Sequence, residues 1–87
     1  MPKKSRKNFN GEGKELSTKV EKSLKAYFKQ LDGEPPCNVY KMVLKEVEAP
    51  LLKIIMEQCN GNQSLASEML GLNRGTLRTK LKEYKLL

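Results

Sequence analysis

The fold is decided by residues 61–82, Gly61-Asn62-Gln63-Ser64-Leu65-Ala66-Ser67-Glu68-Met69-Leu70-Gly71-Leu72-Asn73-Arg74-Gly75-Thr76-Leu77-Arg78-Thr79-Lys80-Leu81-Lys82. Asn62 favours a helix start, because its side chain can accept a hydrogen bond from an amide of the first turn. Gly71 stands where a helix commonly ends in a left-handed residue. Asn73 can cap a second helix in the same way as Asn62. Two short helices joined by one tight turn are typical of a helix-turn-helix.

Apolar residues recur at helical spacing in both predicted helices. The first helix carries Leu65, Ala66, Met69 and Leu70, and the second carries Leu77, Leu81 and Tyr84. Such stripes predict amphipathic helices that pack against each other. The opposite face of the second helix carries Gly75, Arg78, Thr79 and Lys82, and Arg74 lies in its first turn, where a recognition helix usually meets base edges. A cationic face of this kind fits an anion, although it also fits a helix face that is merely solvated.

Gly75 costs the second helix about 1 kcal/mol relative to alanine, so helix stability does not select it. Two explanations are open. The glycine either permits a close approach of a DNA backbone or relieves crowding within the protein.

The formal net charge of +7 is unevenly distributed along the 87 residues. Residues 1–20 carry six basic and two acidic residues, residues 21–59 carry six of each, and residues 60–87 carry five basic and two acidic residues. The excess therefore lies at the N-terminus and in the predicted helix-turn-helix. A polyanionic partner explains this distribution, because phosphate contacts release condensed counterions.

Composition excludes several classes of function. The chain has no His and only two Cys, so we predict no catalytic residues, no metal site, no cofactor and no enzymatic activity. It has no apolar run long enough to span a membrane and no signal-peptide core, which predicts a cytoplasmic protein with no membrane contact. One small domain of this length has a marginal core as a monomer, and oligomerisation would relieve that.

We predict a polar N-terminal tail over residues 1–16 without regular structure, followed by dimerisation helices within residues 17–60 and the helix-turn-helix over residues 61–87. The tail lysines and arginine either contact DNA phosphates nonspecifically or only keep the chain soluble; they are Lys3, Lys4, Arg6 and Lys7.

Two helices are expected in the middle of the chain, over about residues 17–31 and 38–59. In the first, Val20, Leu24, Tyr27, Phe28 and Leu31 form one stripe, and Lys22, Lys25 and Lys29 form another. The second is expected to kink at Pro50. Its second half is apolar nearly all round, so a second copy of the chain is the expected partner.

These residues together resemble the bacterial Fis proteins, the factors for inversion stimulation. The resemblance rests on four segments of the chain: Ala26-Tyr27-Phe28-Lys29-Gln30-Leu31-Asp32-Gly33, Glu46-Val47-Glu48-Ala49-Pro50-Leu51-Leu52, Gly61-Asn62-Gln63 and Gly71-Leu72-Asn73-Arg74-Gly75-Thr76-Leu77-Arg78. It implies an all-α homodimer with four helices per chain, an intertwined four-helix core and a helix-turn-helix on each subunit. It further implies a nucleoid-associated regulator of transcription that bends duplex DNA at degenerate AT-rich sites.

By the same resemblance, Asn73 and Arg74 match the base-contacting positions of the family. The positions that match its phosphate contacts are Asn62, Gln63, Ser64, Thr76, Arg78, Lys80 and Lys82. Leu65, Thr79 and Glu83 replace commonly basic positions, which predicts fewer phosphate contacts.

Two further family partners are less well matched. RNA polymerase is a further partner in the family, but Asn60 replaces an arginine associated with that contact. The N-terminus lacks the strand pattern of the arm with which enteric members touch a recombinase, so stimulation of a recombinase is not predicted.

Three alternatives stay open from the residues alone. The chain could be a detached DNA-binding domain of the kind that ends NtrC-like activators, an RNA-binding module, or a helical module for protein interaction. The RNA reading is weakened because the aromatic residues lie mostly on apolar stripes.

Overall fold

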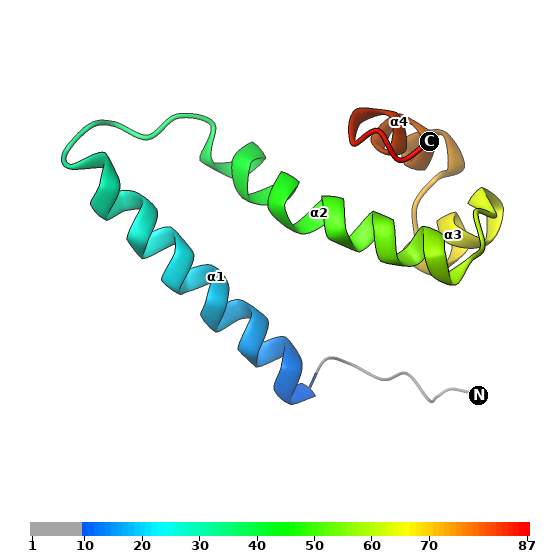
Figure 1. The fold of residues 1–87 in the computed structure, drawn as a ribbon, viewed down its shortest axis with the longest axis horizontal. Helices are drawn as coiled ribbons and strands as arrows, with labels where there is room; N and C mark the ends of the chain where they lie inside the picture. The colour runs from blue at the N-terminus through cyan, green and yellow to red at the C-terminus, as the bar shows by residue number, and fades with distance from the viewer. Residues whose placement is uncertain (1–9) are drawn as a thin grey trace. The chain divides into compact units, whose positions relative to one another are not determined.

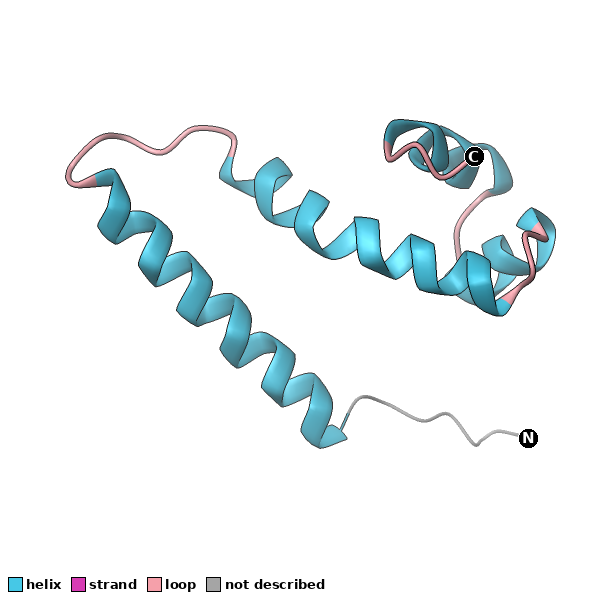
Figure 2. Ribbon diagram, viewed as in Figure 1, coloured by secondary structure: helices cyan, strands magenta, loops and turns pink. Residues whose placement is uncertain are grey.

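The computed structural model describes residues 10–87, with side chains from residue 15 onward. It contains α1 (Asn10–Leu31), α2 (Val39–Gln58), α3 (Gln63–Leu70) and α4 (Arg74–Glu83) (Figure 1). Every regular element in this part of the chain is a helix, which confirms the all-α class with four helices (Figure 2). Lys3, Lys4, Arg6 and Lys7 lie outside the described residues.

The chain divides into two compact units, one that ends at Cys37 and contains α1, and one that runs from Asn38 to Leu87. The sequence analysis instead divided the chain by expected role, with dimerisation helices within residues 17–60 and the helix-turn-helix from Gly61, and that division stays a prediction. The structure groups α2 with the helix-turn-helix because Leu52 and Cys59 of α2 are buried in the same core as residues of α3 and α4.

The first unit consists mainly of α1, which begins at Asn10, whereas the sequence analysis expected the helix to begin at about residue 17. Residues 10–16, predicted as part of an irregular tail, are helical. Adding a residue to an existing helix forms a hydrogen bond without a new nucleation cost, and this offsets the poor helix propensity of glycine in the first turns. The helix ends at Leu31, and Asp32 and Gly33 follow with φ of 52° and 92°.

Helix α2 follows the predicted limits to within one residue and continues without a break through Pro50. Its second half is divided between two environments. Leu52 is 1% exposed, whereas Leu51 and Ile54 are 44% and 51% exposed. The second unit by itself therefore covers only one side of this apolar segment. The kink expected at Pro50 stays a prediction.

The core of the second unit is small and draws on three helices. It consists of Leu52 and Cys59 from α2, Ala66 from α3, and Leu77 and Leu81 from α4. Ile55, Met56, Leu70, Tyr84 and Leu86 pack against it. The apolar stripe predicted for α4 is confirmed as the buried face of that helix.

The apolar stripe predicted for α3 is buried only in part. Ala66 is fully buried and Leu70 packs against the core, but Leu65 and Met69 are 44% and 57% exposed. An eight-residue helix presents only one narrow row of side chains to its neighbours, so two of the four predicted positions remain at the surface.

None of the helices described in residues 10–87 is both long and apolar enough to cross a membrane.

Candidate nucleic-acid interface

Asn62 begins α3 as the sequence predicts. Its backbone is extended, with φ of −79° and ψ of 105°, and its side-chain oxygen Oδ1 accepts a hydrogen bond from the backbone N–H of Leu65 at 3.1 Å. The side chain satisfies one of the amides that a helix leaves unpaired at its N-terminus. The predicted N-cap is confirmed, and it fixes the start of the first helix of the motif.

Gly71 ends α3 in the left-handed conformation, with φ of 73°. The N–H of Leu72 donates to the carbonyl oxygen of Ser67 at 3.0 Å, and the N–H of Gly71 donates to that of Glu68 at 3.3 Å. These two bonds satisfy carbonyls of the last turn in the manner of a Schellman motif. The turn is therefore closed by backbone bonds, and only two residues separate it from α4.

Asn73 caps α4 and also explains Gly75. Its Oδ1 accepts a hydrogen bond from the N–H of Gly75 at 2.8 Å. A Cβ added at Gly75 would lie 3.2 Å from that same oxygen, which is tighter than an ordinary van der Waals contact. A side chain at this position would require that oxygen to move by a few tenths of an ångström, so crowding within the protein is a sufficient reason for the glycine.

Three cationic side chains run along the exposed side of α4. Arg74, Arg78 and Lys82 follow one another at i, i+4 and i+8, and all three are exposed. Residues at this spacing are neighbours on a helix surface. We call these residues the α4 ridge. The buried stripe of Leu77 and Leu81 packs into the core, so the α4 ridge is held at the surface by the packing of the same helix.

Helix α3 reaches this ridge through one side-chain contact. Arg78 donates from Nη1 to Oε1 of Gln63 at 3.1 Å. Gln63 is the first residue of α3, so the start of α3 and the middle of α4 lie together. The structure therefore brings Arg78 beside the segment of Asn62, Gln63 and Ser64 that the resemblance links to phosphates. Thr76 is also exposed, on the far side of the same turn.

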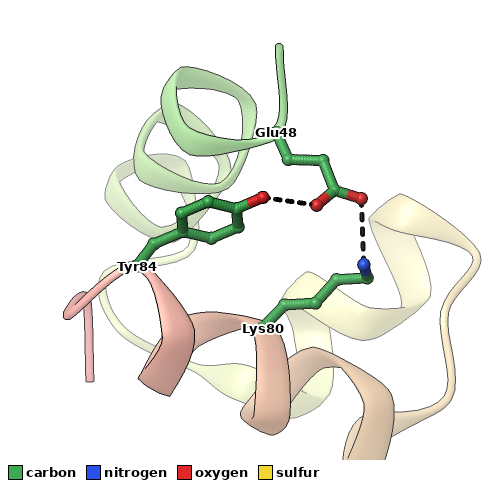
Figure 3. A network of polar contacts seen from close by, with 3 residues as sticks. All are labelled: Glu48, Lys80 and Tyr84. Carbon is green, nitrogen blue, oxygen red and sulfur yellow. Dashed lines mark hydrogen bonds and ion pairs between the residues drawn. The ribbon is translucent and has the colours of Figure 1, made fainter. Parts of the chain in front are cut away.

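Lys80 is placed differently from the other predicted phosphate contacts. Its Nζ lies 2.9 Å from Oε2 of Glu48 on α2, and the two side chains are 28% and 22% exposed. The hydroxyl of Tyr84 donates to the second oxygen, Oε1, of the same carboxylate at 2.6 Å. Figure 3 shows the carboxylate of Glu48 held between the two side chains of α4. We call these three residues the Glu48 network.

The Glu48 network changes the proton affinities of Glu48 and Tyr84. The hydrogen bond from Tyr84, followed by that from Lys80, holds the pKa of Glu48 below its ordinary value of 4.5. The hydrogen bond to Glu48 is the main reason that the pKa of Tyr84 rises from 10.0 to about 12. At neutral pH the carboxylate is therefore ionised and the phenol protonated, which is the state that the contacts require.

The sequence analysis did not predict this network. It named Glu48 only as part of a segment that resembles the family, and Tyr84 only as part of an apolar stripe. The two residues are 36 positions apart, and side chains that meet through the packing of distant helices leave no periodic signal.

No group of three or more His, Cys, Asp or Glu side chains that could hold a metal ion occurs in the part of the chain that the structure describes. The candidate interface consists of cationic and polar side chains on two capped helices.

Comparison with known proteins gives two family matches on this chain. Residues 43–84 match the family described as "Bacterial regulatory protein, Fis family", and residues 7–36 match the one described as "DNA-binding protein Fis N-terminal domain". The two matches together take in the described part of α1, all of α3 and α4, and α2 from Val43 onward.

Whole relatives match over most of their length. A protein of Pseudomonas aeruginosa named as a Fis-like DNA-binding protein is 60% identical over 76 residues, which cover 87% of this chain and 73% of the relative. Proteins with the same name from Neisseria meningitidis serogroups A and B are each 58% identical over 73 residues, covering 84% of this chain and 92% of the relative.

Proposed function

Because this chain belongs to the Fis family, we propose that it is a homodimeric, nucleoid-associated protein of the cytoplasm that binds and bends duplex DNA and regulates transcription. The family match over residues 7–36 supports this proposal over a detached domain of an NtrC-like activator, because it extends the likeness beyond the helix-turn-helix. No enzymatic activity is part of the proposal.

The observation that carries the proposal is the α4 ridge. Arg74, Arg78 and Lys82 are exposed on the helix that follows the tight turn, while the other side of that helix is buried. A helix of this kind fits the major groove of duplex DNA, with its N-terminal residues at the base edges and its cations near phosphates. The proposal therefore places α4 as the recognition helix.

We assign base contacts to Asn73 and Arg74. Arg74 is the first residue of α4 and is exposed, and arginine forms a bidentate pair with a guanine edge. Asn73 uses its Oδ1 in the cap, which leaves its amide nitrogen as the group able to meet a base. Phosphate contacts are assigned to Asn62, Gln63, Ser64, Thr76, Arg78 and Lys82. Lys80 stays a prediction of the resemblance, because a phosphate contact would require it to leave Glu48.

Exposed apolar side chains support the homodimer. Of the α1 side chains that are described, residues 15–31, none is buried, and Phe28 is 49% exposed. On α2, Val47, Leu51 and Ile54 are 38%, 44% and 51% exposed. Isolated chains rarely leave so many large apolar groups in water, and a second copy offers the same apolar faces for mutual burial.

Bending follows from pairing two recognition helices in one dimer. In the family that the sequence resembles, those helices lie closer together than one turn of straight DNA, so a duplex must bend to reach both. The energy of bending depends on base sequence even where no side chain touches a base, which favours AT-rich sites with a compressible minor groove.

The experiment that tests this function is a gel shift with circularly permuted AT-rich duplexes of equal length. We expect mobility to vary with the position of the site, because a bend near the middle retards the complex most. Mixing tagged and untagged chains should give three shifted bands, since a dimer forms two pure species and one mixed species. Equal mobility for all permutations, or only two bands from the mixture, would overturn the proposal.

A further inference from the structure

Helix α1 carries a stripe of lysines that the helix-turn-helix does not use. The stripe consists of Lys19, Lys22, Lys25 and Lys29, and all four side chains are exposed. Intervals of three, three and four residues match the 3.6-residue turn of an α-helix, so the four positions stay on one side of α1. We call them the α1 lysine stripe.

Residues 21–59 have no net charge, but their basic and acidic residues are unevenly distributed. Residues 17–31 hold the four stripe lysines and one acidic residue, Glu21, whereas residues 32–59 hold three lysines and five acidic residues. Residues 17–31 therefore carry a net charge of +3, and residues 32–59 carry a net charge of −2. The zero net charge of residues 21–59 is thus the sum of a positive segment, residues 21–31, and a negative segment, residues 32–59.

The apolar side of α1 lies opposite the stripe. At 3.6 residues per turn, the apolar positions centre roughly 180° from the lysines around the helix axis. These positions are Leu16, Val20, Leu24, Tyr27, Phe28 and Leu31. If a second copy covers that apolar side, as the proposed dimer requires, the lysines face away from the dimer core. Pairing the chains thus leaves the cationic side accessible.

No carboxylate neutralises the stripe in the described part of the chain. The ion pair present among those residues joins Lys80 to Glu48, and none of the four α1 lysines takes part in it. Unpaired ammonium groups in a row attract condensed counterions weakly on their own but bind a polyanion strongly, because the polyanion releases its own counterions.

We propose that the α1 lysine stripe is a second, sequence-independent binding site for the phosphate backbone of duplex DNA. This inference rests on the proposed function, because the stripe then belongs to the same DNA-binding dimer as the helix-turn-helix. The phosphates belong either to DNA that flanks the site held by α4 or to a second duplex. Both sources offer the same chemistry to the lysines, and the experiment separates them.

An anionic membrane is the other partner that a basic amphipathic helix can fit. Membrane binding would insert the apolar side of α1 between lipids, including Phe28 and Leu24. The proposed dimer uses that same side for pairing, so it is not available to lipid. Duplex DNA needs only the lysine side, and we therefore favour it.

The test compares two variants that each lose three exposed lysines. One is Lys22→Gln, Lys25→Gln, Lys29→Gln on α1, and the matched control is Lys41→Gln, Lys45→Gln, Lys53→Gln on α2. Glutamine preserves helix propensity, so both variants should fold, which circular dichroism and sedimentation check first. Each protein is titrated with a short AT-rich duplex that holds one site and with a longer duplex that adds flanking DNA.

We expect the α1 variant to match the unmodified protein on the short duplex and to bind roughly tenfold more weakly than it on the long duplex. Its salt slope, log K against log salt, should fall by about 0.9 for each phosphate that the variant no longer neutralises. That result assigns the stripe to flanking DNA. A capture assay tests the other source: a tethered duplex retains a second, labelled duplex through the protein. If the α1 variant loses binding only in this assay, the stripe is assigned to the second duplex.

Three results would overturn the inference. They are an equal loss in the α2 control, no loss in either DNA assay, and a loss confined to binding of phosphatidylglycerol vesicles. Failure of the unmodified protein to bind the short duplex would instead overturn the proposed function, so the two failures are distinguishable.

Discussion

The hydroxyl of Tyr84 donates a 2.6 Å hydrogen bond to the carboxylate of Glu48, and this bond joins the C-terminal cap of α4 to the middle of α2. Lys80 holds the other oxygen of the same carboxylate at 2.9 Å. Two side chains of the proposed recognition helix thus depend on one residue of α2. The Glu48 network fixes how α4 is turned on α2, in addition to the apolar packing of Leu77 and Leu81.

The first prediction concerns the stability of the fold at high pH. The folded chain raises the pKa of Tyr84 from 10.0 to about 12, so it holds the phenolic proton more tightly than the unfolded chain does. The contribution of this bond to stability is fully present below pH 10 and is lost as the pH rises through about 12. In a Tyr27→Phe, Tyr40→Phe background, Tyr84 is the sole tyrosine, and ultraviolet absorbance reports its ionisation directly.

The control for this titration is Glu48→Gln in the same background. Glutamine has no charge to favour the protonated phenol, so the midpoint should move back toward 10. Identical midpoints with and without the carboxylate would show that the bond does not set the proton affinity of Tyr84.

The second prediction separates two lysines on one helix. Lys82 is exposed, whereas Lys80 is paired with Glu48. We expect Lys82→Ala to lower the salt slope of DNA binding by about 0.9 for the one phosphate it would neutralise, while leaving the thermal midpoint nearly unchanged. Lys80→Ala should lower the thermal midpoint and change the salt slope less. A larger salt effect from Lys80→Ala would mean that Lys80 leaves Glu48 for a phosphate in the complex.

The third prediction concerns base reading by Arg74. Arg74→Ala should weaken binding to a preferred duplex by about 1 to 3 kcal/mol and should flatten the preference among sequences. Lys82→Ala serves as the comparison, because removing a cation that meets only phosphate should weaken all duplexes alike. Competition titrations with preferred and random duplexes measure both effects, and equal losses on the two for Arg74→Ala would remove its assigned role.

The fourth prediction tests the core of the second unit. Leu77 is fully buried, so Leu77→Ala should lower the free energy of unfolding by about 2 to 5 kcal/mol. Leu65 is 44% exposed on α3, and Leu65→Ala should cost about 1 kcal/mol or less. Urea unfolding of both variants at one protein concentration provides the comparison. Similar losses would show that Leu65 is buried in solution, for example by a partner.

The fifth prediction uses Gly75 to measure crowding at the cap of α4. In an Asn73→Ala background, Gly75→Ala should stabilise the protein by up to about 1 kcal/mol, which is the gain in helix propensity. With Asn73 present, the new Cβ meets Oδ1 at 3.2 Å, and the gain should be smaller or absent. Thermal unfolding of the four proteins in this double-mutant cycle gives the coupling, and a coupling of zero would contradict the contact.

The caps of α3 and the start of α4 were predicted well from the sequence, whereas the start of α1 was not. Asn62, Gly71 and Asn73 act through their own backbone and the next few residues, so local chemistry determines their roles. Leu77 and Leu81 were also predicted correctly, because one stripe on a short helix has a single buried direction. The family likeness was confirmed by the match over residues 43–84, which contains this run of caps and turn residues.

Other features depend on contacts that a sequence pattern does not contain. Leu52 is buried and the adjacent Leu51 is exposed because α3 and α4 pack against only one side of α2. The pairing of Lys80 with Glu48 spans 32 positions and arises from the same return of the chain. Gly75 was assigned to either of two causes, and only the distance to the Asn73 oxygen favours one of them.

The absence of any buried side chain among residues 15–31 of α1 has a consequence for how much intact protein a cell can hold. In the proposed homodimer, pairing covers the apolar side of this helix, so the folding of the helix is coupled to pairing. Below the dissociation constant of the pair, the amount of dimer rises with the square of chain concentration, and solitary chains offer an open backbone to proteases. The number of active dimers would then rise more than proportionally with the rate of synthesis, without any dedicated regulator.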